Sequence, residues 1–345
     1  MFLKALFAAA VTFGLLASSA ANAQVKILVS VFVGPAHFIH TPYKAWGAEV
    51  AKVTDGRVVV DFLPASAAPP PKQIEGALAG NFDGAFMFNG FNGKRAPFTQ
   101  MLLLPFLMEG NAEAGSVATW RTYEKYFNDL GQFEKVGITP LSYFQFPGGH
   151  FFSGGDPILS IADLKGRKMW ALAGTPTRVL KLAGVDHVAG PAARLAEFVQ
   201  NNTVEGVAGI SQDAIITFGG LDFTKSATVR DDARLGVPNF IMFVTTKKWE
   251  EISAADQAAI RNISGEPFAR AVGKAADVAE AKRRKQLIDK GVKIVETPEA
   301  FKQELIEVSA PLFDAWKKSA AKMGVDAQEP IDFYKAQTAA VAAGN

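Results

Sequence analysis

The sequence predicts an α/β protein of two domains with mainly parallel sheets, and three observations support this fold class. The chain has 345 residues, which is long for one globular core at about 150 residues per domain. Apolar, strand-like runs alternate with helix-like stretches, which is typical of strand–helix–strand units. Hydrophobic residues make up 49% and charged residues 20% of the chain, as in globular rather than disordered proteins.

The first 23 residues have the features of a secretory signal. Lys4 is followed by an uncharged apolar run over residues 5–17, and Ala21-Asn22-Ala23 fits the small-x-small pattern of a cleavage site. The apolar run of about 13 residues is shorter than the roughly 20 that cross a bilayer as a helix. We therefore expect an exported, soluble protein that is cleaved after Ala23.

Elements of the first half follow from apolar periodicity and turn residues. We expect strands over residues 25–32, 57–63 and 85–88, and helices over about 41–54 and 72–79. Four prolines within residues 64–71 exclude a helix there. The resulting order is strand, helix, strand, helix, strand.

The second half repeats this theme. Strands are expected over residues 138–146, around 168–171 and over 204–210, with helices over about 176–183 and 192–200. A helical pattern then runs from about 254 to 290, and Gly265 and Pro267 should kink or split it. A helix of that length can span two domains.

Composition and motifs exclude several function classes. The net charge of +2 gives no field to attract nucleic acid, and the basic run 282–285 has acidic neighbours, as on a solvated helix face. The absence of cysteine excludes disulfides and thiolate sites. No dinucleotide, P-loop, zincin or serine-hydrolase signature occurs, and His37 and His40 lie between two prolines without a supporting carboxylate. We expect no cofactor and no metal.

Several short motifs, in this order, resemble those of the solute-binding proteins of tripartite ATP-independent periplasmic (TRAP) transporters. They are the segments TDGRVVV (54–60), GNFD (80–83), LPFL (104–107), DLKGRK (163–168), VQNNTVEG (199–206) and WEEISAADQ (249–257). Each is weak alone, but together they cover most of the chain.

The resemblance implies a periplasmic two-domain clamshell with hinge strands and a long domain-spanning helix. Domain I would comprise residues 24–145 plus about 229–265, and domain II residues 146–228 plus about 266–345. Strands near 138–146 and 228–244 would rotate as the cleft closes on a small organic solute. The implied partners are that solute and the TRAP membrane permease subunits, and the protein would be a monomer.

The departures from the family pattern bear on the ligand. Where the family has an arginine that pairs with a substrate carboxylate, this chain has Trp170, and a second basic position upstream falls near His150. An indole offers a flat face and one N–H donor instead. Phenylalanines also concentrate at expected strand ends. These features favour an aromatic or a neutral or cationic solute.

The candidate ligand-binding residues lie at expected strand ends or match family positions: Trp170, His150, Phe32, His37, Phe88, Asn89, Phe146, Ser211, Gln212 and Asn239. Two alternatives remain open. The aromatic side chains could simply fill the core, or an organic acid such as a dicarboxylate could be held by Arg178, Arg95 or His150.

An exported α/β enzyme is the hypothesis from another class. It would need a nucleophile with a base, or paired carboxylates, at strand ends. Asp83 and Glu205 are the nearest acidic candidates, but both match structural positions of the binding-protein pattern. Binding without catalysis is therefore the preferred interpretation.

Overall fold

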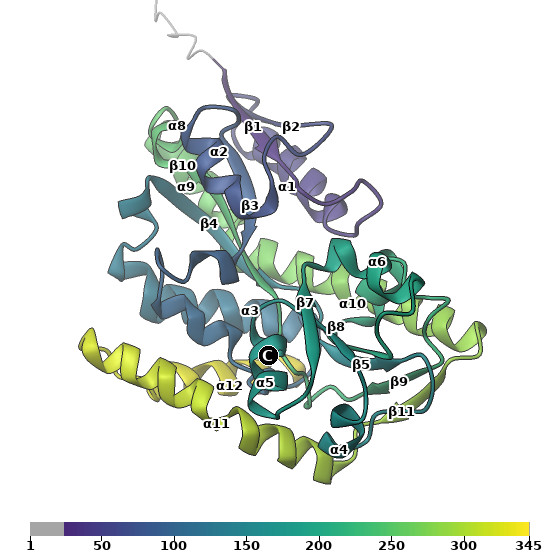
Figure 1. Cartoon of the computed structure of the whole chain (residues 1–345). Helices are drawn as coiled ribbons and strands as arrows, with labels where there is room; N and C mark the ends of the chain where they lie inside the picture. The colour runs from purple at the N-terminus through teal and green to yellow at the C-terminus, as the bar shows by residue number, and fades with distance from the viewer. Residues whose placement is uncertain (1–23, 345) are drawn as a thin grey trace, which may run out of the picture.

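Two β-sheets flanked by helices form the molecule. The structure, a computed structural model, describes residues 24–344, so the expected signal segment and the cleavage after Ala23 lie outside the described residues. The first sheet lies in the upper part of the view in Figure 1 and the second in the lower right. The prediction of an α/β protein with two sheets is confirmed.

The first sheet has the strand order β2-β1-β3-β10-β4. Its strands are β1 (Val25–Ser30), β2 (Val58–Phe62), β3 (Gly84–Phe88), β4 (Ile138–Gln145) and β10 (Asn239–Thr245). β1 pairs in parallel with β2 and β3, whereas β10 lies antiparallel between β3 and β4. The chain therefore leaves the first sheet after β4 and returns to it with β10.

The second sheet has the order β11-β9-β5-β8-β6-β7. Its strands are β5 (His150–Ser153), β6 (Met169–Leu172), β7 (His187–Gly190), β8 (Gly206–Ile210), β9 (Ser226–Val229) and β11 (Lys293–Glu296). Only β5 is antiparallel to its neighbours. Adjacent residues contribute to separate apolar cores, with Phe151 in one and Phe152 in the other, because alternate side chains point to opposite faces of a strand.

Helices cover both sheets. They are α1 (His40–Val53), α2 (Gln73–Leu78), α3 (Ala112–Thr122), α4 (Ile161–Lys165), α5 (Thr175–Leu182), α6 (Leu195–Gln200), α7 (Gln212–Thr217), α8 (Thr246–Glu250), α9 (Ala254–Ile263), α10 (Gly265–Asp289), α11 (Glu299–Lys322) and α12 (Glu329–Ala342). A 3-10 segment, η3 (Phe98–Leu103), precedes α3. None of the helices between residues 24 and 344 is long and apolar enough to cross a membrane.

The predicted long helix is interrupted where its glycine and proline occur. α9 ends at Ile263, Ser264 leaves the helical conformation, and Gly265 begins α10 with a φ of +50°, which glycine tolerates. α10 packs against α3 and β4 on the side of the first sheet and against α7 on the side of the second. The prediction that this helix bridges the two sheets is confirmed.

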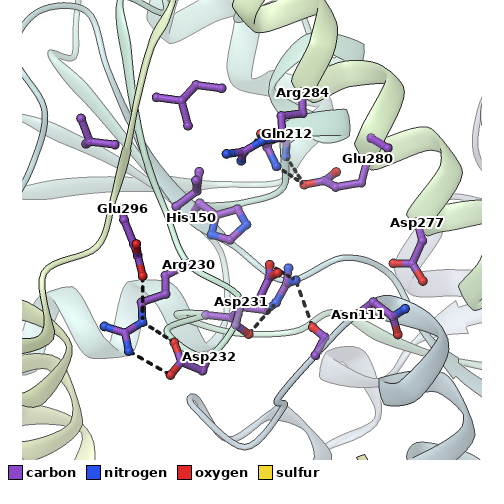
Figure 2. A pocket seen from close by; sticks show the side chains of 16 residues that line it. Asn111, His150, Gln212, Arg230, Asp231, Asp232, Asp277, Glu280, Arg284 and Glu296 are labelled. Carbon is purple, nitrogen blue, oxygen red and sulfur yellow. Dashed lines mark hydrogen bonds and ion pairs between the residues drawn. The ribbon is translucent and has the colours of Figure 1, made fainter. Parts of the chain in front are cut away.

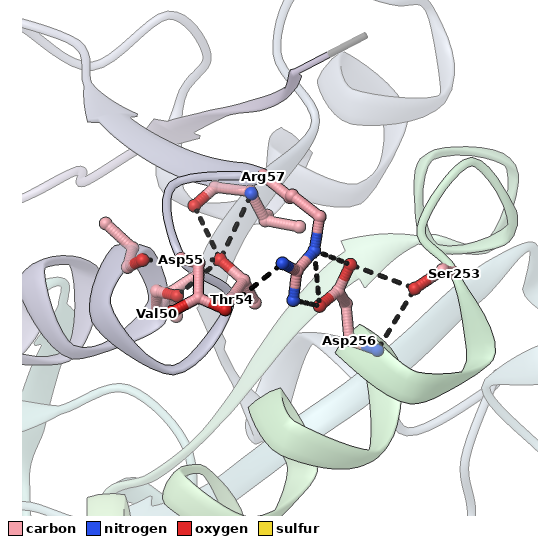
Figure 3. Close-up of polar contacts among 8 residues, drawn as sticks. Val50, Thr54, Asp55, Arg57, Ser253 and Asp256 are labelled. Carbon is pink, nitrogen blue, oxygen red and sulfur yellow. Dashed lines mark hydrogen bonds and ion pairs between the residues drawn. The ribbon is translucent and has the colours of Figure 1, made fainter. Parts of the chain in front are cut away.

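The segment Thr54–Arg57 connects α1 to β2 through a polar network (Figure 3). The Thr54 hydroxyl donates to the Val50 carbonyl at 2.7 Å and accepts from the Val58 amide at 3.1 Å. Arg57 Nη2 donates to Asp256 in the first turn of α9 at 2.8 Å, and Arg57 Nε also contacts that carboxylate. This motif therefore fixes a turn and ties β2 to α9.

The predicted domain boundaries can be compared with the sheets, although the division itself stays a prediction. The boundary near residue 146 coincides with the connection between β4 and β5, and the one near 229 with the end of β9. The C-terminal segment was assigned to domain II. Its last helix, α12, packs against α3 beside the first sheet, while α11 contacts both α5 and η3.

Candidate functional site

The carboxyl ends of strands from the two sheets face each other across a cleft. A small pocket between them is lined by Phe88 and Leu103 from the first sheet's side and by Leu172, Pro176 and Gly209 from the second. Across this pocket, the Thr175 hydroxyl donates a hydrogen bond to the Leu103 carbonyl at 2.6 Å. The pocket holds about 20 Å³, roughly the space of one water molecule. A solute therefore needs the two sides to separate.

An aromatic cluster lies at the strand ends of the first sheet, and its member Phe88 lines the small pocket. It comprises Phe32, His37, Phe38, Phe86, Phe88, Phe146 and Phe240, which come from the ends of β1, β3 and β4, the start of β10 and the turn before α1. Phe146 is central, with ring centroids 4.1 Å from Phe240, 4.9 Å from Phe38 and 5.1 Å from His37. Phe32 stacks on Phe86 at 4.3 Å.

The cluster is only partly covered. Phe86 is fully buried and Phe240 nearly so, whereas Phe32, Phe38, Phe88 and Phe146 are half-buried. Four aromatic rings are thus partly exposed, and Phe88 among them lines the small pocket at the cleft. The structure brings together four of the predicted residues here, namely Phe32, His37, Phe88 and Phe146.

His37 belongs to this cluster and is held in its neutral form. Its Nδ1 accepts from the Ile39 amide at 3.3 Å. The pKa of His37 is lowered to about 4, mainly by burial; Asp213 of α7 opposes this effect, and His40 adds a smaller lowering effect.

The connection between β4 and β5 passes through two glycines. A Cβ on Gly149 would collide with the backbone of Gly209, and a Cβ on Gly148 would collide with the side chain of Arg234. Gly149 also donates its amide to the Gly236 carbonyl at 2.8 Å, within the return connection from β9 to β10. The two crossings between the sheets therefore touch each other.

Beside these crossings lies a larger, charged cavity of about 750 Å³, called here the hinge cavity (Figure 2). Its lining residues include Asn111, His150, Gln212, Arg230, Arg234, Asp277, Glu280, Arg284 and Glu296. They come from α3, β5, α7, α10, β11 and the connection after β9. Two further predicted residues, His150 and Gln212, therefore lie together, but in this cavity.

Two carboxylates of α10 dominate one wall of the hinge cavity. Asp277 accepts from the Ala112 and Glu113 amides at 2.7 and 3.0 Å, at the start of α3. Glu280 accepts from the Gln212 and Asp213 amides at 2.8 Å each, at the start of α7. Burial raises the pKa of both carboxyl groups, and the amide donors oppose that effect.

His150 is 2% exposed, and burial together with Arg234 and Arg284 lowers its pKa well below the ordinary value. Its ring is therefore neutral, and its Nδ1 has no hydrogen-bond partner among the described residues. A positively charged His150 that pairs with an organic acid is therefore not favoured by this environment.

The remaining predicted residues are buried. Trp170 is 0% exposed in the core beside α6 and α7, and its Nε1 has no partner among residues 24–344. Asn89 donates to the Thr99 carbonyl at 2.8 Å, and Asn239 donates to the Leu102 carbonyl at 2.7 Å. Ser211 caps α7 by accepting from the Ala214 amide. The structure thus gives Asn89, Asn239 and Ser211 contacts to backbone groups.

The alternative basic residues do not meet at the aromatic cluster. Arg95 pairs with Glu75 at 2.7 Å on the first sheet's side, and Arg178 is exposed on α5.

The acidic candidates for catalysis accept hydrogen bonds from backbone amides: Asp83 accepts from the Leu28 amide and Glu205 from the Lys168 amide. No group of three or more histidine, aspartate or glutamate side chains in the described chain could hold a metal ion.

Sequence reasoning missed Phe240, Arg234, Asp277 and Glu280. Phe240 directly follows Asn239, which was predicted from its match to a family position, so its neighbourhood could have been included. Asp277 and Glu280 are three residues apart on a charged helix, where acidic residues usually indicate a solvated face. Only their long-range contacts reveal their role.

Comparisons with known proteins agree with this architecture. The model of the DctP family, bacterial extracellular solute-binding protein, family 7, matches residues 29–319. The outer membrane transporter protein TsaT of Comamonas testosteroni is 37% identical over 331 residues, which cover 94% of each chain.

Three solved structures share the fold. A TRAP periplasmic solute-binding protein from Bordetella bronchiseptica with bound (R)- and (S)-mandelate has a TM-score of 0.83 at 24% identity, covering 92% of this chain and 99% of that one. One from Rhodoferax ferrireducens with copurified benzoate has a TM-score of 0.78 at 23% identity, covering 92% and 98%. A marine metagenome protein with 3-hydroxybenzoate has a TM-score of 0.79 at 23% identity, covering 92% and 98%. The family model covers most of the chain, and these receptors have the same fold. The chain therefore belongs to the DctP family of solute-binding proteins of TRAP transporters.

Proposed function

We propose that this TRAP receptor captures a small aromatic acid in the cleft between its two sheets. The carrying observation is the aromatic cluster at the strand ends of the first sheet. The rings of Phe32, Phe38 and Phe146 are half-buried, and the half-buried Phe88 also lines the small pocket at the cleft. A benzene ring fits against such rings by offset or edge-to-face contacts. Proteins of the same fold bind mandelate, benzoate and 3-hydroxybenzoate, which supports this ligand class.

The acid group would be held differently from the usual family arrangement. Trp170 stands where the resemblance expects an arginine, and its buried Nε1 is a hydrogen-bond donor without a partner among the described residues. A buried donor of this kind costs free energy unless it is paired. Pairing with a carboxylate or hydroxyl oxygen of the solute would remove that cost when the cleft opens to admit it.

Capture requires movement, because the pocket at the cleft holds only about 20 Å³. The two sides would separate about the crossings at residues 146–149 and 230–238 and close again on the solute, since only the closed form contacts it from both sides. Delivery to TRAP permease subunits, a monomeric state and cleavage after Ala23 complete the proposal. The family consists of binding and transport proteins, which favours capture without turnover.

The test is a binding series on protein stripped of copurified ligand by unfolding and refolding. Benzoate, mandelate and 3-hydroxybenzoate should raise the melting temperature by mass action, and calorimetry should give one site. Benzyl alcohol and succinate separate the contribution of the ring from that of the acid group. If none of the aromatic acids binds while succinate does, the proposed ligand class is wrong.

Phe146→Ala tests the location of the site. Loss of a central ring should weaken binding of the aromatic acid by roughly ten- to a hundredfold, or about 1–3 kcal/mol. Phe146→Leu preserves apolar volume in case the alanine variant is unstable. Phe333→Ala is the matched control, because this half-buried ring packs on Tyr126 beside α12 and should leave the affinity unchanged.

A further inference from the structure

The hinge cavity is separate from the aromatic cluster and has the dimensions of a ligand site. Its volume of about 750 Å³ lies within the roughly 300–1,000 Å³ typical of small-molecule pockets. It is bounded by the connection after β9, by α10 and by the first turns of α3 and α7. The proposed capture of an aromatic acid makes no use of this cavity.

Two buried polar side chains at the cavity have unused hydrogen-bonding atoms. Arg234 donates from Nε to the Asp231 carbonyl and from Nη2 to Asp231 Oδ1 and the Gly110 carbonyl. Its Nη1 has no partner in the described chain, although the side chain is 6% exposed. His150 Nδ1 is likewise without a partner. Buried polar atoms are nearly always paired, so a water molecule or a ligand is expected beside these two.

The unpaired donors at the cavity favour an oxyanion as that partner, although its lining carries five carboxylates and three arginines. Arg284 makes only a 3.4 Å contact, to Gln212 Oε1, and has no ion pair among the described residues. Arg230, by contrast, is neutralised by Asp232 and Glu299. The unused groups of the cavity are therefore mainly donors.

The acidic residues limit the charge that this site can accept. Asp277 and Glu280 direct their oxygens at the amides of α3 and α7, but their negative charge still faces the cavity (Figure 2). Asp231 already pairs with Arg234 and is 79% exposed. A ligand with one acid group meets less repulsion here than one with two.

We propose that the hinge cavity binds a small oxyanion, with one carboxylate or phosphate group held by Arg234 Nη1, Arg284 and His150. Such a ligand would connect the return crossing, which carries Arg234, to α10, which carries Arg284. It would thereby stabilise one relative position of the two sheets. The site would act on the opening of the cleft without contacting the captured solute.

The test uses the full-length secreted protein, saturated with the aromatic acid that binds best or, if none binds, without it. The sequence has four histidines, so ¹⁵N-histidine labelling resolves His150 by NMR. Lactate and inorganic phosphate are titrated separately at constant ionic strength. A saturable shift of the His150 ring signals with lactate alone indicates an organic acid, with phosphate alone an inorganic ion, and with both the shared oxyanion group.

Arg284→Ala should weaken the response tenfold or more, equivalent to about 1.4 kcal/mol. Lys282→Ala removes the same charge from α10 at a position that is exposed, as Arg284 is, but does not line the hinge cavity, and should change the response less than twofold. The proposal is overturned if His150 does not respond to either anion at millimolar concentration, or if Arg284→Ala responds like the wild type. It is also overturned if the aromatic acid competes with lactate, because the two sites would then be one.

Discussion

In the proposed site, Trp170 supplies the hydrogen-bond donor for the acid group of the solute. It is fully buried, yet its indole N–H has no partner among the described residues. We predict that Trp170→Phe weakens the binding of benzoate or mandelate by tenfold or more, since a hydrogen bond to a charged group contributes about 1.5–3 kcal/mol. Binding of benzyl alcohol should weaken less. Calorimetry on both ligands measures the difference.

Unchanged affinity in Trp170→Phe would also have a clear physical cause. If Trp170 only fills the core, removing an unpaired buried donor leaves affinity unchanged and offsets part of the cost of lost volume. Trp249→Phe provides the control, because Trp249 is a buried tryptophan of the first core and lies outside the proposed site. Equal affinity in wild type and Trp170→Phe would exclude the indole from ligand binding.

At the scale of residues, the sequence predicts where side chains lie better than it predicts which way they point. Phe32, Phe88 and Phe146 were expected at strand ends, and the structure places them in one cluster at the cleft. Asn89 was expected there by the same argument and Asn239 by its match to a family position, but both are fully buried and donate to backbone carbonyls. The direction of a side chain depends on contacts with distant segments, here Thr99 and Leu102, which no local pattern encodes.

At the scale of elements, the contact of Arg57 with Asp256 shows how a turn motif supports the first sheet. Arg57 lowers the pKa of Asp256, with the Ser253 hydroxyl contributing in the same direction. The ionised carboxylate therefore stabilises the fold above its ordinary pKa near 4, and this stabilisation is lost as pH falls through the lowered value. Asp256→Asn should reduce the free energy of unfolding at pH 7 by roughly 1–2 kcal/mol.

The pH dependence distinguishes the ion pair from simple loss of packing. The difference between wild type and Asp256→Asn in urea unfolding should shrink as the pH is lowered below about 4, because protonation removes the same charge. A constant difference at every pH would mean that charge is not involved. Glu197→Gln is the control, since it breaks a fully solvated pair with Arg194 and should have little effect.

Elements with strong local signals were predictable, and so was the four-residue strand β6, but several other short strands were not. The break between α9 and α10 follows from Gly265 and Pro267, and α1 and α5 lie within a residue of their expected bounds. β5, β7 and β11 have four residues each, too few for a periodicity to emerge. β10 inserts antiparallel between β3 and β4 by pairing with strands that are distant in the sequence, and the local sequence does not specify such pairing.

At the scale of the whole molecule, α10 holds both sheets through two side chains one turn apart. Asp277 caps α3 beside the first sheet, and Glu280 caps α7 beside the second. A carboxylate that accepts from the first amides of a helix satisfies donors that have no partner within it. The two caps let one helix fix the position of each sheet separately.

This arrangement predicts that two matched variants each affect a different pair of backbone amides. Asp277→Ala should accelerate hydrogen exchange at the Ala112 and Glu113 amides, and Glu280→Ala at the Gln212 and Asp213 amides. Loss of a hydrogen bond to a charged group costs roughly 1.5–3 kcal/mol of local opening free energy, so each effect should exceed about tenfold. Each variant is the control for the other, measured by NMR at one pH. If either variant accelerates both pairs of amides equally, the sheets open as one unit, and α10 does not hold them independently.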